Sequence, residues 1–259
     1  MKKPTAPHWN SQHARIYCGD SQAILREIPT ASVHAIVTDP PYSSGGLHRS
    51  DRNLKTSDKY VMGGTDIDRP EFHGDNRDQR SFTYWCSLWM AECLRITRPG
   101  GYLMTFSDWR QVPAMSDAIQ AGGWIWRGQV VWDKTEASRP QKGWFRTGQS
   151  EFVLLASHVP MTQEQNRIGA CHAGVWRGSV QAAEKQHITG KPLNLMKWLL
   201  GVLPADATIL DPFAGSGTTL LAAQELGLQS IGIEISPIYC EIIRRRLSQE
   251  TLPLAECTP

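Results

Sequence analysis

The chain has 259 residues and a formal net charge of +2, and 41% of its residues are hydrophobic. This length and composition are ordinary for a globular protein and suit one α/β domain over residues 1–259, or two small ones, with a sizeable core. The small charge does not by itself indicate nucleic-acid binding, and six scattered cysteines without a C-x-x-C pair argue against a zinc site or a disulfide framework.

The N-terminal segment is basic but is followed by no apolar stretch, so it does not resemble a secretory signal. No apolar run is long enough to span a membrane. We therefore expect a cytoplasmic protein whose cysteines are reduced and mostly buried, since a free cysteine behaves as a small hydrophobic residue.

Short apolar runs typical of strands alternate with helical patterns along the chain, which predicts an α/β fold with a mostly parallel sheet. In chain order, the predicted strands lie at residues 33–38, 102–106, 124–132, 151–156, 208–210 and 230–233. The predicted helices lie at residues 21–28, 81–97, 110–121, 193–203, 218–226 and from 237 onward. Pro-Gly-Gly at 99–101 should end one helix, and Gly-Gly at 122–123 should end the next.

The last helix should begin with Ser236 as its N-cap and Pro237 in its first turn, which are favoured placements for both residues. We predict that its buried side carries Ile238, Ile242 and Leu247. The three arginines at 244–246 should interact with the dipole of the helix end.

Two polar stretches interrupt the alternation. Residues 43–80 are rich in Gly, Asp and Arg and are long for a connection, and residues 158–190 are also mixed and polar. Loops of that length are usually functional or disordered. We interpret 43–80 as a long substrate-facing loop and 158–190 as a short candidate target-recognition segment.

A glycine-rich turn joins the strand at 208–210 to the following helix. Gly215 and Gly217 allow a tight turn and a close approach of the backbone to a ligand. No lysine follows the glycines, so the turn is not a P-loop, and it lacks the third glycine of the dinucleotide fingerprint. The predicted cofactor-binding residues of this turn are Asp211, Pro212, Phe213, Ala214, Gly215, Ser216, Gly217, Thr218 and Thr219.

Glu234 ends the next predicted strand and strengthens this interpretation. An acid at that place can accept hydrogen bonds from both ribose hydroxyls of an adenosine-bearing cofactor. The alternatives are a turn that is merely tight and an acid that merely caps the following helix. Strand, glycine-rich turn, helix and strand with a trailing acid together predict a nucleotide-binding βαβ unit.

Asp39, Pro40, Pro41 and Tyr42 follow the first predicted strand and are the candidate catalytic residues. The two prolines stiffen the chain and lack N–H donors, which leaves carbonyls free to accept. An exocyclic NH2 group is a poor nucleophile because its lone pair is delocalised into the ring. Acceptors on its two N–H bonds would localise that lone pair, and Tyr42 would offer a stacking face. The alternative is a strand-end turn with a packed tyrosine.

Thr-Asp-Pro-Pro-Tyr at 38–42 and the turn at 211–219 together resemble the DNA amino-methyltransferases that modify N6 of adenine or N4 of cytosine. The resemblance covers residues 16–247, and the catalytic motif precedes the cofactor turn, as in the beta group of this family. It implies a Rossmann-like S-adenosylmethionine-dependent methyltransferase fold, with a mixed, mostly parallel seven-stranded sheet and helices on both faces. It also implies S-adenosyl-L-methionine as cofactor, double-stranded DNA as substrate and, in many members, a homodimer.

The same resemblance suggests two further cofactor-binding residues. The segment Ile-Tyr-Cys-Gly-Asp at 16–20 is similar to the family segment that contacts the cofactor adenine, with Asp20 as acceptor. Asp20 could equally cap the helix at 21–28, and the two roles are compatible. Lys191, before Pro192, resembles the family lysine beside the methionine end of the cofactor, although the proline usual after His187 is absent here.

The family implies a mechanism in which the target base is flipped out of the duplex, because its amino group cannot be reached within the stack. Tyr42 would stack on the base, while Asp39 and the Pro40 carbonyl would hold its amino group. The nitrogen would then attack the sulfonium methyl in line, helped by proximity and orientation. No Pro-Cys pair is present, so the nucleophile of cytosine-C5 enzymes has no counterpart.

Basic residues interleaved with aromatic ones suit phosphate contact and base stacking. Such a cluster follows the predicted strand at 124–132, and its alternative interpretation is a solvated loop. The candidate DNA-binding residues are Lys134, Arg139, Lys142, Trp144 and Arg146.

Because aspartate precedes Pro-Pro-Tyr, the resemblance favours adenine N6 as the target. Cytosine N4 is the nearest alternative. RNA or protein-glutamine methyltransferases are more distant, since those relatives usually carry asparagine there and place the motif after the cofactor turn. A non-catalytic binding protein of the same fold is the alternative from a different class, and intact Asp39, Tyr42, Gly215 and Glu234 argue against it.

Overall fold

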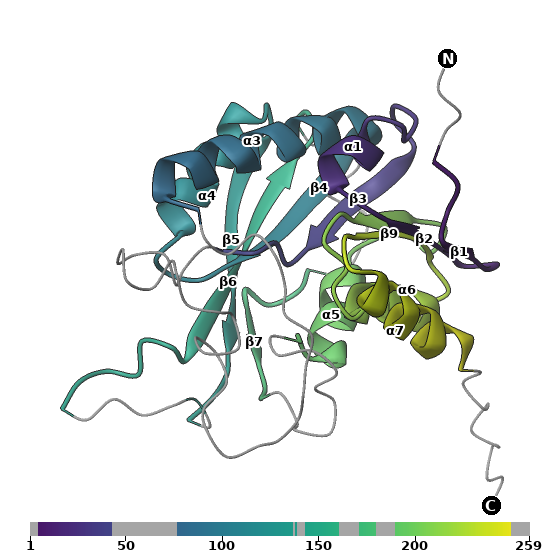
Figure 1. The fold of residues 1–259 in the computed structure, drawn as a ribbon. Coiled ribbons are helices and arrows are strands. Elements are labelled where there is room, and N and C mark those ends of the chain that lie inside the picture. The colour runs from purple at the N-terminus through teal and green to yellow at the C-terminus, as the bar shows by residue number, and fades with distance from the viewer. Residues whose placement is uncertain are drawn as a thin grey trace, which may run out of the picture.

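The computed structural model describes residues 5–42, 77–136, 138, 143–160, 171–179 and 190–249. Their strands form one mixed sheet in the order β1-β2-β9-β8-β3-β4-β6-β5-β7 (Figure 1). The strands are β1 (Trp9–Asn10), β2 (Ala14–Cys18), β3 (Val33–Thr38), β4 (Thr97–Ser107), β5 (Ile125–Asp133), β6 (Ser150–Ser157), β7 (Val175–Arg177), β8 (Thr208–Asp211) and β9 (Gln229–Glu234).

Five neighbouring strands, from β2 through β9, β8 and β3 to β4, run parallel to one another. β6 is antiparallel to both β4 and β5, so the sheet is mixed. The predicted seven-stranded sheet is confirmed as the central part of this arrangement. Two short edge strands, β1 and β7, extend it among the described residues.

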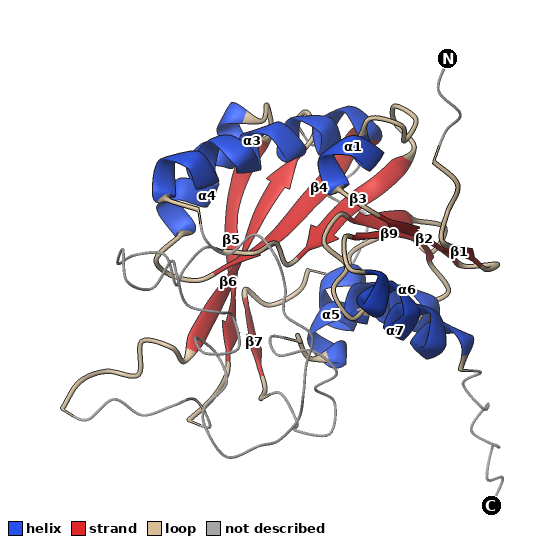
Figure 2. Ribbon diagram, in the orientation of Figure 1, coloured by secondary structure: helices blue, strands red, loops and turns tan. Residues whose placement is uncertain are grey.

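Helices cover both faces of the sheet, as predicted (Figure 2). One layer contains α1 (Ser21–Leu25), α3 (Gln79–Ile96) and α4 (Val112–Ala121), and the other contains α5 (Leu193–Leu200), α6 (Thr218–Glu225) and α7 (Pro237–Ser248). The first layer packs on a core around Trp89, Met115 and Ile36, which are fully buried. The second packs on separate clusters that include Leu200 and Ile243.

The junction between α3 and β4 differs from the prediction. α3 begins at Gln79, two residues before the expected start, because the Asp78 carboxylate accepts from the amides of Arg80 and Ser81. The Pro-Gly-Gly stretch at 99–101 does not separate helix from strand but lies within β4. Gly100 adopts φ +83° and donates its amide to the carbonyl of His158, just beyond the end of β6, so the stretch is hydrogen-bonded to the neighbouring chain segment.

The buried side of α7 was predicted partly wrongly. Leu247 is buried, but Ile238 is 59% exposed and Ile242 is half-buried. The buried residues of this helix are instead Tyr239, Cys240, Ile243 and Leu247. The buried stripe is therefore rotated by about one residue, because packing against α6 and β2 rather than periodicity alone sets the orientation of the helix.

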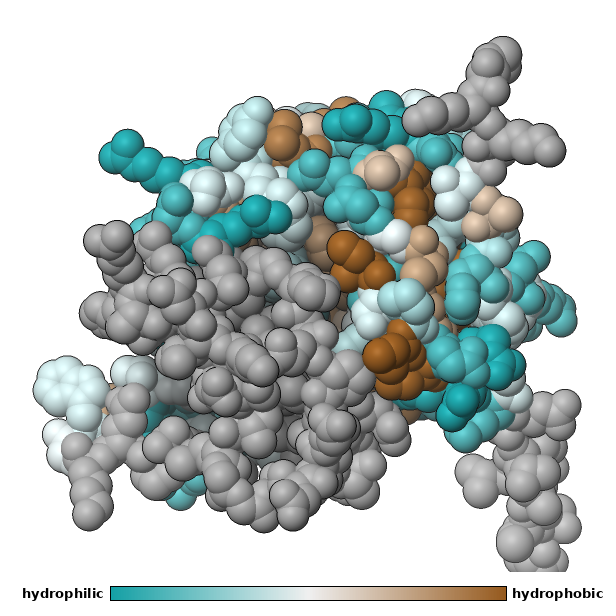
Figure 3. All heavy atoms as spheres, in the orientation of Figure 1, coloured by the Kyte–Doolittle hydropathy of each residue, from teal (hydrophilic) through white to brown (hydrophobic). Residues whose placement is uncertain are grey.

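Among the described cysteines, Cys86, Cys93 and Cys240 are buried, Cys18 is half-buried and Cys171 is exposed, and all five are free thiols. On the face in Figure 3, hydrophobic atoms of the described residues gather only in small, separate patches. No helix in the described part of the chain is long and apolar enough to cross a membrane.

Candidate active site

The candidate site lies along one edge of the sheet. The carboxyl ends of parallel strands meet at the same edge, and this places Thr38 of β3 and Asp211 of β8 near one another. Because β6 is antiparallel to β4, its first residues lie at this edge as well, and Phe152 is opposite Ser107. The edge therefore collects residues from the beginning, middle and end of the chain.

The tetrapeptide at 39–42 follows β3 directly. The Tyr42 hydroxyl donates to Oδ1 of Asp39 over 2.5 Å, and the Nζ of Lys191 donates to Oδ2 over 2.6 Å. Pro40 is buried, whereas Pro41 is half-buried. The carboxylate has about four acceptor positions, so these two bonds leave capacity for two further donors.

Lys191 joins the Asp39 carboxylate to a second one. Its ammonium group lies 3.4 Å from Oε2 of Glu151, and the side chain is only 7% exposed. Glu151 in turn accepts from Lys134 over 2.8 Å. The rings of Phe106 and Tyr42 flank the Lys191 ammonium at 5.1 and 5.4 Å. The result is a row of alternating charges, Asp39, Lys191, Glu151 and Lys134.

The charges of this row shift one another's pKa values. Burial raises the pKa of Asp39, and the nearby Lys191 only partly offsets that effect. Burial alone would raise the pKa of Glu151, but Lys191 and Lys134 bring it below its usual value. Burial would lower the pKa of Lys191, yet Asp39 and Glu151 together raise it. Burial and the Asp39 charge raise the pKa of Tyr42 well above its usual value.

The glycine-rich turn has the tight geometry that its sequence predicts. Gly215 and Gly217 adopt φ values of +52° and +80°, in the left-handed region that favours glycine. A Cβ atom on Gly217 would approach Cγ2 of Ile243 to 2.9 Å, so α7 packs closely against the turn. The amide of Gly217 bonds to the carbonyl of Ala214, and α6 begins immediately afterwards.

Three contacts fix the beginning of this turn. Asp211 is 2% exposed and accepts from the Thr38 hydroxyl over 2.7 Å, which ties the turn to β3. The Ser21 hydroxyl donates to the carbonyl of Pro212. Phe213 packs against Trp85 and Trp89, with ring centroids 5.3 Å away in each case. Burial raises the pKa of Asp211 to about 6.

The segment that leads to Asp20 pairs with Glu234, because Cys18 lies opposite Glu234 and the amide of Gly19 donates to the carbonyl of Glu234. The Glu234 carboxylate accepts from the amides of Gly215 and Ser236, each over 2.9 Å. It therefore braces the turn and the start of α7. Ser236 stands at the predicted N-cap position but makes no capping bond with its side chain. Asp20 is exposed and caps α1 by accepting from the amide of Ala23.

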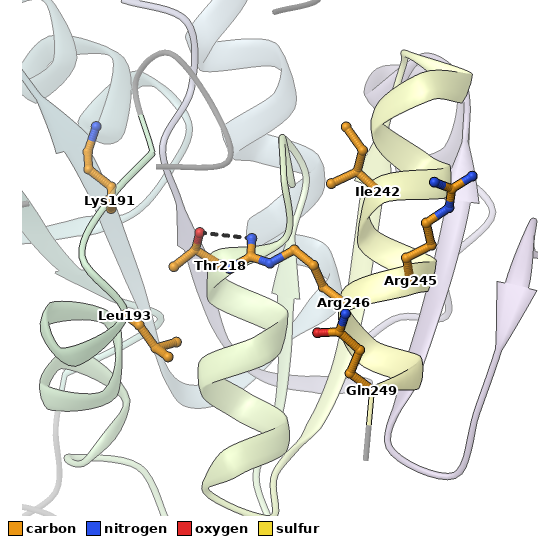
Figure 4. A pocket seen from close by; sticks show the side chains of 7 residues that line it. All are labelled: Lys191, Leu193, Thr218, Ile242, Arg245, Arg246 and Gln249. Atoms are coloured by element: carbon orange, nitrogen blue, oxygen red, sulfur yellow. Dashed lines mark hydrogen bonds between the residues drawn. The ribbon is translucent and has the colours of Figure 1, made fainter. Parts of the chain in front are cut away.

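Arg246 contacts the turn from the far end of α7. Its Nη1 donates to the carbonyl of Ser216 over 2.5 Å and approaches the Thr218 hydroxyl at 3.4 Å (Figure 4). This contact replaces the helix-dipole role predicted for Arg246, while Arg244 and Arg245 bond to Glu241. A cavity of about 390 Å³ lies alongside, and its lining residues are Lys191, Leu193, Thr218, Ile242, Arg245, Arg246 and Gln249.

The candidate DNA-binding residues lie in the connection between β5 and β6. Trp144 is 70% exposed and packs edge to face against Phe145, which is 77% exposed. Arg146 donates to the carbonyls of Glu136 and Ser138 and so braces the connection from within. Lys134 is engaged with Glu151. Arg139 and Lys142 lie outside the described residues.

The two polar stretches are described only in part. Residues 43–76, 161–170 and 180–189 lie outside the described residues, so most of the predicted loop and much of the predicted recognition segment are not placed. Within the second stretch, the structure adds strand β7, where Trp176 packs edge to face against Trp132.

Sequence reasoning missed Glu151 and the contact made by Arg246. Glu151 was placed in a strand, but the signal for its role is a pairing register that brings the start of β6 to the catalytic edge. Arg246 was grouped with its two neighbours. Only the helical position relative to the glycine turn distinguishes it, and that position depends on the orientation of α7.

Comparisons with known proteins agree with this geometry. The family described as DNA methylase, with the short name N6_N4_Mtase, matches residues 33–245. The chain is similar to the type II methyltransferase M.HindIII of Haemophilus influenzae, at 25% identity. The match covers 91% of this chain and 95% of that relative.

Solved structures share the fold. The structure of TTHA0409 from Thermus thermophilus, in complex with S-adenosyl-L-methionine, has a TM-score of 0.64 at 22% identity and covers 93% of this chain and 97% of that one. The PvuII DNA methyltransferase, described as cytosine-N4-specific, has a TM-score of 0.68 at 16% identity and covers 95% and 90%. The predicted α/β methyltransferase fold is thereby confirmed.

The glycine turn provides a test of the packing. Gly217→Ala and Gly227→Ala both place a side chain at positive φ, which costs about 1–2 kcal/mol of unfolding free energy. Only the Cβ at 217 meets Ile243, so Gly217→Ala should lose roughly 1–3 kcal/mol more than Gly227→Ala, which has open space around it. Urea unfolding measures both losses, and equal values would contradict the close packing of α7 on the turn.

Proposed function

Since this chain belongs to the DNA methylase family, we propose that it transfers a methyl group from S-adenosyl-L-methionine to N6 of an adenine flipped out of double-stranded DNA. The observation that carries the proposal is the meeting of the two predicted motifs: Asp39 and the glycine turn lie at one sheet edge, linked by the bond from Thr38 to Asp211.

The residues at the edge suit the cofactor. S-Adenosylmethionine would supply an electrophilic methyl group on a positively charged sulfur. The glycine turn offers a backbone that a ligand can approach closely, the Glu234 carboxylate contacts it, and Glu234 and Asp20 would be the acceptors for the adenosine part. The cavity beside Thr218 and Lys191 extends from the other side of the turn.

The catalytic tetrapeptide suits an amino group. Asp39 accepts from Tyr42 and Lys191 and keeps acceptor capacity for one N–H of the target, and the Pro40 carbonyl would accept the other. As the nitrogen attacks, an N–C bond would form, the C–S bond would break and its electron pair would stay on sulfur. The nitrogen would then release one proton to solvent water, and the products would be the methylated base and S-adenosylhomocysteine.

Adenine is the finer part of the proposal. It is supported by aspartate, rather than serine, before Pro-Pro-Tyr in a chain that resembles the adenine-modifying members at this motif. Cytosine N4 presents an amino group of the same chemistry, and the PvuII enzyme, which has the same fold, is described as specific for it. Both bases therefore need to be measured together.

The first prediction concerns Asp39. Asp39→Ala should lower methyl transfer by at least about a hundredfold, because the target amino group loses its charged acceptor, while cofactor affinity stays nearly unchanged. DNA from expressing cells that lack adenine methylation of their own should be digested to nucleosides and analysed by mass spectrometry. The wild type should give N6-methyldeoxyadenosine, and the Asp39→Ala variant should not.

Asp117→Ala, at an exposed position of α4, is the matched control and should retain the product. N4-methyldeoxycytidine in place of the adenine product would support the proposed mechanism but show that cytosine, not adenine, is the target base. Neither product, from a folded wild-type protein, would reject the proposed reaction.

The second prediction concerns Glu234, whose pKa burial raises to about 7. Ribose hydroxyls donate to the ionised carboxylate, so the cofactor should bind that form. Affinity should then rise about tenfold between about pH 6 and about pH 8 as the carboxyl group loses its proton. Glu234→Gln should weaken binding and remove this dependence, as calorimetry can measure. Glu27→Gln, at an exposed position, should keep the pH dependence of cofactor affinity. A wild-type affinity that does not change with pH would contradict the role of Glu234.

The third prediction concerns the exposed aromatic pair between β5 and β6. Trp144→Ala should weaken binding of duplex DNA by roughly 1–3 kcal/mol, because a stacking surface is lost. Fluorescence anisotropy at constant salt measures the affinity. As a control, Trp126→Ala removes a 41% exposed tryptophan from the opposite end of β5 and should leave the DNA affinity unchanged. Equal affinities for both variants would show that this connection does not contact DNA.

A further inference from the structure

Glu151 does not belong to either recognised motif, yet it lies two contacts away from Asp39. It follows Ser150 at the start of β6, and the antiparallel pairing with β4 brings it to the catalytic edge. Its Oε2 lies 3.4 Å from the Lys191 ammonium, which in turn bonds to Asp39 over 2.6 Å. Its side chain is 16% exposed.

A buried ammonium group beside Asp39 would by itself oppose the reaction. The attacking amino nitrogen becomes positively charged before it loses its proton, and a cation close to its acceptor disfavours that charge. Lys191 would also compete with the amino group for the lone pairs of Asp39. The second carboxylate, on Glu151, shares the ammonium group and compensates for its charge.

The surroundings limit Lys191 to this shared position. The rings of Phe106 and Tyr42 lie at 5.1 and 5.4 Å from its nitrogen, and the side chain is 7% exposed. Besides one another, Asp39, Lys191 and Glu151 interact with the titratable groups of Tyr42, Lys134 and Asp211. Asp108 acts on Tyr42. Lys134 holds Glu151 from the other side over 2.8 Å.

We propose that Glu151 is a positioning residue for methyl transfer, acting through Lys191: it shares the ammonium group and so keeps Asp39 a strong acceptor for the target amino group. This inference rests on the proposed function. It assigns a residue of the antiparallel strand β6 a role in methyl transfer. The role differs from that of an ion pair that only stabilises the fold.

The test compares Glu151→Gln with the wild type in single-turnover transfer of labelled methyl groups to unmethylated genomic DNA, which requires no knowledge of the target sequence. The rate at the optimal pH should fall roughly tenfold, because Asp39 becomes a weaker acceptor. Cofactor affinity, measured by calorimetry, should stay unchanged. Glu92→Gln removes a surface partner of Arg95 and should leave the rate and the affinity as in the wild type.

The pH profile gives a readout that a merely structural role would not move. The Glu151 charge raises the pKa of Asp39, so its removal should lower that pKa and shift the acid limb of the rate profile to lower pH. Glu151→Asp keeps the charge but shortens the reach to Lys191. It should recover part of the rate and leave the acid limb near its wild-type position.

A second measurement is independent of activity. Glu151 raises the pKa of Lys191, so the Lys191 side-chain NMR signal, assigned with Lys191→Met, should titrate at lower pH in Glu151→Gln. An unmoved Lys191 titration overturns the inference even if the wild type proves inactive, an outcome that would reject the proposed function separately. A folded Glu151→Gln with the wild-type rate and pH profile overturns it as well. If Glu151→Gln does not fold, a folded Glu151→Ala variant with the wild-type rate and Lys191 titration overturns the inference.

Discussion

The parallel pairing of β3 with β8 is the constraint on which the site depends. It brings together two loops that are separated by most of the chain, and the bond from Thr38 to Asp211 fixes their relative position within the buried edge. Each loop has a local shape of its own, prolines in one and positive-φ glycines in the other. Neither shape is useful for methyl transfer unless the two strands are adjacent, because the acceptor and the methyl donor must meet in line.

A second layer of organisation is electrostatic. Buried charges are tolerated when they are paired, and here the pairing extends over four residues rather than two. Lys191 was expected beside the cofactor from its resemblance, whereas the structure places its ammonium group on Asp39 and its side chain along the cavity beside Thr218. Lys191 thus adjoins both halves of the site, and Glu151 of β6 compensates for its charge.

Much of the fold follows from local sequence. Residues 33–38 form a strand as predicted, and the turn at 211–219 has the expected form, because both are encoded by adjacent residues. The roles of Glu151 and Arg246 do not follow, since they depend on which residue of β6 pairs with Ser107 and on how α7 is rotated. Ile238 shows the same limit, because a periodic pattern identifies a helix more securely than its buried face.

The pairing of β2 with β9 has a consequence for the order of folding. Cys18 lies opposite Glu234, so this side of the candidate site joins two strands that are far apart in the sequence. Contacts so distant in sequence form slowly and only after chain closure. On the ribosome, the sheet from β3 to β6 can assemble before β9 is made, but the pairing of β2 with β9 forms only when β9 has emerged. A nascent chain therefore lacks this side of the candidate site until β9 has been synthesised.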